Sequence, residues 1–122
     1  MKCLVVDDSR VVRTVSRRIL EELGMTCEEA EDGQKAFEHC LKSMPDAVMI
    51  DWNMPVMNGY DFVIQLRKSP GGTKPKIIFC STENGAQAIK RALSAGADEY
   101  IMKPFDIDII QSKLALMGLI DS

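Results

Sequence analysis

Three carboxylates follow two apolar segments of this chain and form its most reactive combination of residues. Asp51 comes directly after the apolar run 47–50, and Asp7 and Asp8 come directly after the run 3–6. In open parallel α/β sheets, ligands bind in the crevice outside the carboxyl ends of the strands. If the two runs are neighbouring strands, the three acids converge, and their mutual repulsion disfavours joint ionisation unless a cation compensates it. The spacing therefore predicts a cation-dependent acidic site.

Two further polar side chains stand at the ends of apolar segments. Ser81 follows the run 76–80, and Lys103 follows the run 99–102. A carboxylate nucleophile, an acid pair, a hydroxyl donor and a fixed ammonium are the groups that a phosphoryl-transfer site needs. Mg²⁺ prefers oxygen ligands and keeps several waters, so it suits the acids and leaves room for a phosphoryl oxygen. We therefore expect Mg²⁺ as the cofactor, with Lys103 supplying a second positive charge.

Strand-like and helix-like segments alternate along the whole chain and must position these side chains. Strands are expected at 2–6, 25–30, 47–50, 76–80 and 99–102, and helices at 9–23, 32–43, 59–67, 84–95 and 106–117. The side chains expected to face the core on the first two helices include Val12, Val15, Ile19, Leu23 and Leu41. Near-continuous apolar strands indicate burial on both faces. The expected fold is α/β, a five-stranded parallel sheet with five helices on both faces.

Length and charge limit the classes of function. The chain has 122 residues and a formal net charge of −3. We expect a single domain at 1–122 with no output domain, because the last expected helix ends shortly before Ser122. The acidic charge argues against a nucleic-acid partner, and no apolar stretch approaches the ~20 residues needed to span a bilayer. With no N-terminal signal pattern, we expect a cytoplasmic protein with reduced cysteines and no membrane partner.

The residues at the strand ends resemble those of a known family. The motifs that carry the resemblance are Val5-Val6-Asp7-Asp8-Ser9, Asp51-Trp52-Asn53-Met54-Pro55-Val56-Met57-Asn58-Gly59, Ser81 and Lys103-Pro104-Phe105. In this order, they resemble the receiver domain of bacterial two-component response regulators, and are most similar to the stand-alone CheY-like type. The resemblance spans essentially the whole chain. It implies a flavodoxin/CheY-like fold with the strand order 2-1-3-4-5, for which CheY is a standard example.

The resemblance implies a role for each acidic residue. Asp51 corresponds to the phosphoryl acceptor of the family. Asp8 and Asp51 would bind Mg²⁺ directly, and Asp7 would act mainly through water. Asn53 would contribute its main-chain carbonyl to the same ion.

The resemblance also implies roles for residues around the acids. Ser81 and Lys103 would bind the phosphoryl oxygens, and the Lys103-Pro104 peptide bond would be cis. Ser81 and Tyr100 would form the switch that responds to phosphorylation. Asn53 and Glu83 occupy the two positions that tune self-hydrolysis in this family, and their pairing implies rapid autodephosphorylation.

The function implied is a phosphorylation-activated switch rather than an enzyme, since it would catalyse only its own phosphorylation and dephosphorylation. The phosphoryl group would come from a histidine kinase or phosphotransfer protein. A downstream protein would bind the face formed by the last two helices and strand five, in a chemotaxis-type role. A phosphorelay intermediate or a phosphate sink is the alternative within this class. The chain is expected to be a monomer or a weak dimer.

Other interpretations of the same residues remain open from the sequence. Asp7, Asp8 and Ser81 are also types that cap helices, and Tyr100 suits a half-buried strand position. A Mg²⁺-dependent aspartyl phosphatase of the haloacid dehalogenase type uses similar groups, but it carries an Asp-x-Asp motif after its first strand, where this chain has adjacent acids. A scaffold that is not phosphorylated is a further alternative.

Overall fold

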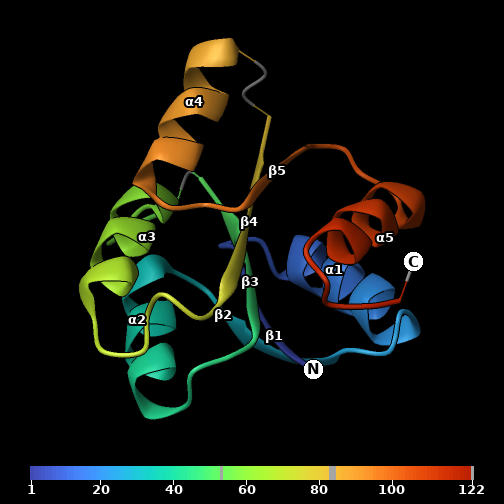
Figure 1. The fold of residues 1–122 in the computed structure, drawn as a ribbon, viewed down its shortest axis with the longest axis horizontal. Coiled ribbons are helices and arrows are strands. Elements are labelled where there is room, and N and C mark those ends of the chain that lie inside the picture. Colours follow the sequence, from blue (N-terminus) through green and yellow to red (C-terminus); the bar gives the residue numbers. More distant parts are fainter. Residues whose placement is uncertain (53, 83–84, 122) are drawn as a thin grey trace.

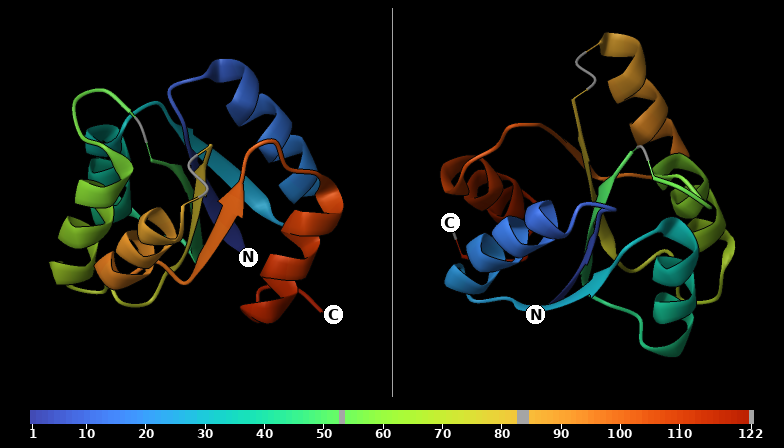
Figure 2. Two further views of the ribbon diagram at one scale, coloured as in Figure 1. Left: turned by 90° about the horizontal axis from the view of Figure 1, so that it is seen from above. Right: turned by 180° about the vertical axis from the view of Figure 1, so that it is seen from behind.

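The computed structural model describes residues 1–52, 54–82 and 85–121, which form one parallel sheet with helices on both faces (Figures 1 and 2). The strands are β1 (Lys2–Val6), β2 (Thr26–Ala30), β3 (Ala47–Asp51), β4 (Lys76–Ser81) and β5 (Glu99–Met102). The helices are α1 (Arg10–Glu22), α2 (Gly33–Lys42), α3 (Gly59–Lys68), α4 (Ala86–Ala95) and α5 (Ile107–Leu116). The strand order is β2-β1-β3-β4-β5, and every neighbouring pair is parallel. The expected fold and strand order are confirmed.

The sheet is buried on both faces by two groups of helices. Helices α1 and α5 cover one face, and α2, α3 and α4 cover the other (Figure 1). Strand side chains alternate between the faces, so Leu4 packs in one core cluster with Phe62 of α3. Val5 packs in the opposite cluster with Leu20 of α1. This two-sided burial is the physical reason why the central strands are apolar at nearly every position.

The inward faces of α1 and α2 differ in part from the prediction. Val15 and Leu41 were expected in the core, but their side chains are 46% and 55% exposed. On α1 the fully buried positions are Ser16 and Leu20, four residues apart on one line of the helix. The apolar pattern predicted Val15 as the buried residue instead of the neighbouring Ser16, because a serine is not counted as a core residue.

Side chains begin four of the five helices by capping their first turns. Ser9, Asp32, Asn58 and Asp106 each accept a hydrogen bond from a main-chain N–H three residues further on. Each cap satisfies a donor that the helix itself leaves unpaired. These residues also fix where each helix begins after the preceding strand. The candidate site lies at these strand ends.

Arg67, near the end of α3, connects the segments at the amino ends of β4 and β5, on the side of the sheet opposite the carboxyl ends of the strands. Its guanidinium donates to the carbonyl oxygens of Gly72, Pro75 and Gly96 at 2.8–3.0 Å and pairs with Asp98 at 3.0 Å. Asp98 in turn accepts from the N–H of Ile77 at 2.8 Å. The planar guanidinium is suited to such multiple contacts. The amino ends of β4 and β5 are thereby fixed to α3.

The four cysteines are all free and buried. Burial raises the pKa of the Cys27 thiol to about 11 and that of the Cys40 thiol to about 12. Such thiols are uncharged at neutral pH and behave as small apolar side chains. Among the described helices, none is long and apolar enough to cross a membrane.

Candidate functional site

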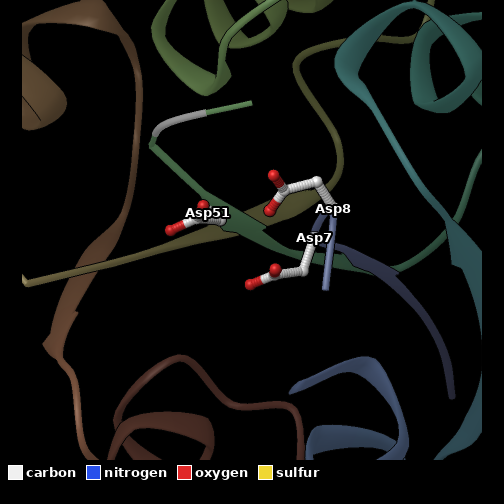
Figure 3. Close-up of side chains that lie close together, drawn as sticks. All are labelled: Asp7, Asp8 and Asp51. Carbon is white, nitrogen blue, oxygen red and sulfur yellow. The ribbon is translucent and has the colours of Figure 1, made fainter. Parts of the chain in front are cut away.

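The three predicted carboxylates lie together at the carboxyl edge of the sheet (Figure 3). Asp51 is the last residue of β3, and Asp7 and Asp8 follow the end of β1. The two strands are hydrogen-bonded neighbours in which Val6 lies opposite Ile50, so the acids after them are adjacent. One carboxylate oxygen from each residue lies within 4.8 Å of the others. Asp7 is only 4% exposed, Asp51 is half-buried and Asp8 is exposed.

Lys103 places its ammonium between two of these carboxylates. Its Nζ donates to Asp7 Oδ2 at 2.9 Å and to Asp51 Oδ1 at 3.0 Å. Its main-chain N–H donates to the carbonyl oxygen of Ser81 at 2.8 Å, which anchors the residue to the end of β4. The Lys103-Pro104 peptide bond is cis, as the resemblance implied. The predicted convergence of acids and ammonium is therefore present in the fold.

The charges of the site shift the pKa values of its residues. Burial raises the pKa of Asp51, Lys103 opposes the rise, and the negative charges of Asp7 and Asp8 add to it. Burial alone would lower the pKa of Lys103, but the hydrogen bonds and charges of Asp7 and Asp51 raise it overall. Lys103 is consequently a fixed positive charge at neutral pH. Asp51 is ionised at a higher cost than an exposed aspartate.

The donor set fits a hard divalent cation. Three carboxylates face one ammonium, which leaves a net negative charge in the cluster. Mg²⁺ binds oxygen ligands and is usually held by one or two carboxylates together with water. Because Asp8 is exposed, the cluster is open to water on that side. The residues of the cluster therefore suit Mg²⁺, and within the described part of the chain the cluster includes no sulfur or imidazole ligand of the kind that zinc prefers.

Of the other predicted residues, Ser81 stands at the same edge of the sheet, Tyr100 lies within β5 opposite Phe79, and two lie outside the described residues. Ser81 ends β4 and is 1% exposed. Tyr100 lies in β5, is 8% exposed and packs in the core cluster between the sheet and helices α2, α3 and α4. The metal-binding and lifetime roles expected of Asn53 and Glu83 concern positions that the structure does not describe.

A tight turn after β3 joins Asp51 to α3. Gly59 donates its N–H to the carbonyl oxygen of Trp52 at 3.0 Å, and a Cβ at Gly59 would lie 2.4 Å from the carbonyl oxygen of Asp51. Within the turn, Met57 N–H donates to the Pro55 carbonyl oxygen at 2.7 Å, so the residue between them is the centre of a γ-turn. That residue, Val56, has a φ of 68°, which is strained for a β-branched side chain. The strand end carrying Asp51 is thus held by close backbone packing.

An aromatic cluster beside Asp51 was not predicted from the sequence. The Trp52 ring stacks on Tyr60 with centroids 5.9 Å apart and contacts Phe79 at 5.1 Å. The Arg91 guanidinium of α4 lies 5.5 Å from the Trp52 centroid and 5.1 Å from that of Tyr60. Such contacts are typical of cation–π interactions. Helix α4 is therefore in contact with the residue next to Asp51.

Arg13 of α1 is a second residue at the site that sequence reasoning missed. Its guanidinium donates to the main-chain carbonyl oxygen of Asp7 at 2.6 Å and to Glu29 Oε1 at 2.9 Å. No local motif distinguishes it from the other arginines of the same helix. Only the pairing of β2 beside β1 brings Glu29 within reach.

The chain is similar to known proteins over most of its length. The family model described as "Response regulator receiver domain" matches residues 3–115. Chemotaxis protein CheY1 of Helicobacter pylori is 40% identical over 119 residues, which cover 96% of each chain. The chemotaxis protein CheY homolog of Campylobacter jejuni is 40% identical over 116 residues, covering 93% of this chain and 89% of the relative. The solved structure of the chemotaxis response regulator CheY4 of Vibrio cholerae matches with a TM-score of 0.89 at 30% identity, over 94% of this chain and 96% of that one.

Proposed function

The chain belongs to the response regulator receiver family, and from this premise we propose that it is a phosphorylation-driven switch whose phosphoryl acceptor is Asp51. The observation that carries the proposal is the position of Lys103 Nζ, which contacts both Asp7 and Asp51. An acceptor carboxylate flanked by an ammonium and two further acids is the arrangement that phosphoryl transfer requires. The chain acts as a phosphoacceptor regulator, without turnover of a separate substrate.

In the proposed reaction, Asp51 takes the phosphoryl group from a phosphohistidine of a kinase or phosphotransfer protein. A carboxylate oxygen of Asp51 attacks phosphorus, and the N–P bond breaks as the O–P bond forms. The bonding electron pair goes to the imidazole nitrogen that carried phosphorus. The other ring nitrogen carries a proton, so the partner's histidine leaves as a neutral imidazole. Lys103 stabilises the negative charge on the phosphoryl oxygens because its ammonium already lies 3.0 Å from Asp51. Bound Mg²⁺ would supply further neutralisation of these oxygens.

The proposed metal ligands are the acidic residues of the cluster. Asp8 and Asp51 hold Mg²⁺ directly, and Asp7 acts through water. This division agrees with exposure, because Asp8 is open to solvent whereas Asp7 is buried and bound to Lys103 and to the N–H of Ser9. The carbonyl of Asn53 completes the proposed set.

The switch is proposed to couple the site to a partner face. Ser81 donates its hydroxyl to the phosphoryl group and draws the end of β4 inward. Tyr100 is already buried, so we propose that phosphorylation stabilises this position of the ring rather than creating it. The partner face lies on α4, β5 and α5, where Leu93, Met102 and Ile109 are exposed apolar side chains.

A chemotaxis-type role is the proposed pathway, supported by the relatives named as chemotaxis proteins at 40% identity. In that role the acyl phosphate is short-lived, as the combination of asparagine at position 53 and glutamate at position 83 in the sequence suggests. A phosphoryl half-life of hours would contradict this part of the proposal.

The test is incubation with acetyl phosphate and Mg²⁺, followed by intact-mass measurement and Trp52 fluorescence. We expect a labile phosphoryl adduct in the wild type and none in Asp51→Asn. Trp52 is a suitable reporter because it follows Asp51 directly in the chain. An adduct retained in Asp51→Asn would refute the assignment of the acceptor. No adduct in the wild type would refute the phosphoryl switch itself.

A further inference from the structure

We propose that Arg13 is a positioning residue for the Mg²⁺ site, and that it sets the orientation of Asp8 by fixing the peptide unit between Asp7 and Asp8. The inference rests on the Mg²⁺-dependent function proposed above and extends it to a residue outside the acidic cluster. Arg13 has no contact with the phosphoryl group in this scheme. Its effect passes through the main chain.

The first step is the contact that Arg13 makes with the end of β1. One terminal nitrogen of its guanidinium donates to the carbonyl oxygen of Asp7 at 2.6 Å. That carbonyl belongs to the peptide unit that continues into Asp8, so the hydrogen bond fixes the plane from which Asp8 projects. The Arg13 side chain is 13% exposed, and the contact is largely shielded from water.

The second step is the anchoring of Arg13 itself. Its Nε lies 2.9 Å from Glu29 Oε1, on the strand beside β1. A guanidinium is planar and rigid, so one group held by Glu29 presents its other nitrogen to Asp7 in a fixed direction. Glu29 also pairs with Arg17 at 3.0 Å, one turn further along α1. Arg17 pairs in turn with Glu21 at 3.1 Å, so the two arginines face two carboxylates. The charge of Arg13 is thus balanced locally, which makes its contribution geometric.

The third step is what holds Asp8. Asp7 is fixed on every side, because its N–H donates to Ala30, one carboxylate oxygen accepts from Ser9 and the other from Lys103. Among the described residues, no side-chain hydrogen bond involves the Asp8 carboxylate, which is exposed. Its direction therefore depends on the backbone around it. Replacing a residue that hydrogen-bonds a metal ligand directly commonly changes metal affinity by about 10–100-fold. For Arg13, which acts through the main chain, we expect an effect at the lower end of that range.

The experiment compares Arg13→Met with Arg17→Met, a matched control that loses a contact with the same Glu29 but none with Asp7. Mg²⁺ dissociation constants are measured by calorimetry, and thermal unfolding is measured in EDTA. We expect Arg13→Met to weaken Mg²⁺ binding about tenfold and Arg17→Met to leave it within about twofold. Arg17→Met loses ion pairs with Glu29 and Glu21, and Arg13→Met loses one ion pair with Glu29 and the hydrogen bond to Asp7. Each variant thus loses two polar contacts, and thermal unfolding without metal shows whether their losses of stability are comparable.

Arg13→Lys separates geometry from charge. It keeps the positive charge but has no fork to bridge Glu29 and Asp7, so we expect its Mg²⁺ affinity to stay close to that of Arg13→Met. Full recovery in Arg13→Lys would overturn the geometric role. If Arg13→Met does not fold, Glu29→Gln replaces it, and an Mg²⁺ affinity equal to the wild type would overturn the inference.

The outcomes also distinguish this inference from the proposed function. If the wild type binds Mg²⁺ and Arg13→Met binds it with the same affinity, only the role of Arg13 is overturned. A wild type that does not bind Mg²⁺ overturns the proposed function and this inference with it. Weakened binding in Arg13→Met alone supports both.

Discussion

Replacing Asp51 by asparagine is expected to stabilise the metal-free protein, although it removes an ion pair with Lys103. The carboxylate oxygens of Asp51, Asp7 and Asp8 lie within 4.8 Å of one another, so each repulsion involving Asp51 costs about 3.5 kcal/mol at an effective dielectric constant of about 20. The attraction to Lys103 at 3.0 Å contributes about 5.5 kcal/mol on the same basis. Two repulsions outweigh one attraction, and the balance favours Asp51→Asn by about 1–2 kcal/mol.

The assay is thermal unfolding in EDTA at neutral pH. A gain of this size raises the Tm of a domain of this length by about 4–8 °C. Asp121→Asn is the control, because it changes the net charge equally at an exposed position away from the cluster. Surface changes of that kind usually stay within about 0.5 kcal/mol. A Tm for Asp51→Asn below that of the wild type would refute the electrostatic reasoning.

The pH dependence gives the same prediction an independent check. The pKa of Asp51 is raised, first by burial and then by Asp7 and Asp8 against the opposing effect of Lys103. A raised folded pKa favours the folded state below the unfolded pKa, and this contribution is lost as the pH rises through the folded value. The stability gap between Asp51→Asn and the wild type should therefore open with rising pH and close in acid.

Saturating Mg²⁺ should reverse the order of the two proteins. The wild type gains about 2.7 kcal/mol when the free ion is 100 times its dissociation constant, whereas the variant lacks one proposed ligand. An unchanged order in Mg²⁺ would contradict the assignment of Asp51 as a ligand. It would leave the prediction for EDTA standing.

Three further changes test the surroundings of the acids. Lys103→Met should slow phosphorylation by acetyl phosphate about 100-fold, because it removes the charge that stabilises the phosphoryl oxygens. It should also tighten Mg²⁺ binding, since the ammonium that competes for Asp7 and Asp51 is gone; weaker Mg²⁺ binding by calorimetry would contradict this second expectation. Val56→Gly should raise the free energy of unfolding in urea by about 1–2 kcal/mol, because it relieves the strained φ at an exposed side chain; an unchanged or lower value would show that the turn stores no strain. Gly59→Ala should lower that free energy by about 2–3 kcal/mol, because its Cβ meets the Asp51 carbonyl oxygen; a stabilised variant would refute that reasoning.

The sequence predicted the elements and the acid–ammonium cluster because both depend on local patterns. Apolar runs ended by Asp7, Asp51 or Lys103 mark strand ends directly, and parallel strands bring their carboxyl ends to one edge. Val15 was misplaced because the buried line of α1 includes Ser16, and apolar periodicity does not detect a small polar residue in a core.

The contacts that the sequence did not predict depend on which strands and helices become neighbours. Arg91 reaches Trp52 only because α4 packs beside α3. Arg13 reaches Asp7 and Glu29 only because β2 pairs with β1. Neither arginine differs from a surface arginine in its local sequence, so the folded arrangement was needed to find them.

The span between Asp7 and Lys103 has a consequence for how the protein is made. Their ion pair closes 96 residues of chain, and such distant contacts add to the entropic cost of folding. Synthesis proceeds from the N-terminus, so all three carboxylates leave the ribosome before the only ammonium that pairs with Asp51 among the described residues. A nascent chain that ends before residue 103 therefore carries the acids without their counter-charge. The proposed acceptance of a phosphoryl group is thereby tied to synthesis of the whole sheet, because Lys103 follows the last residue of β5.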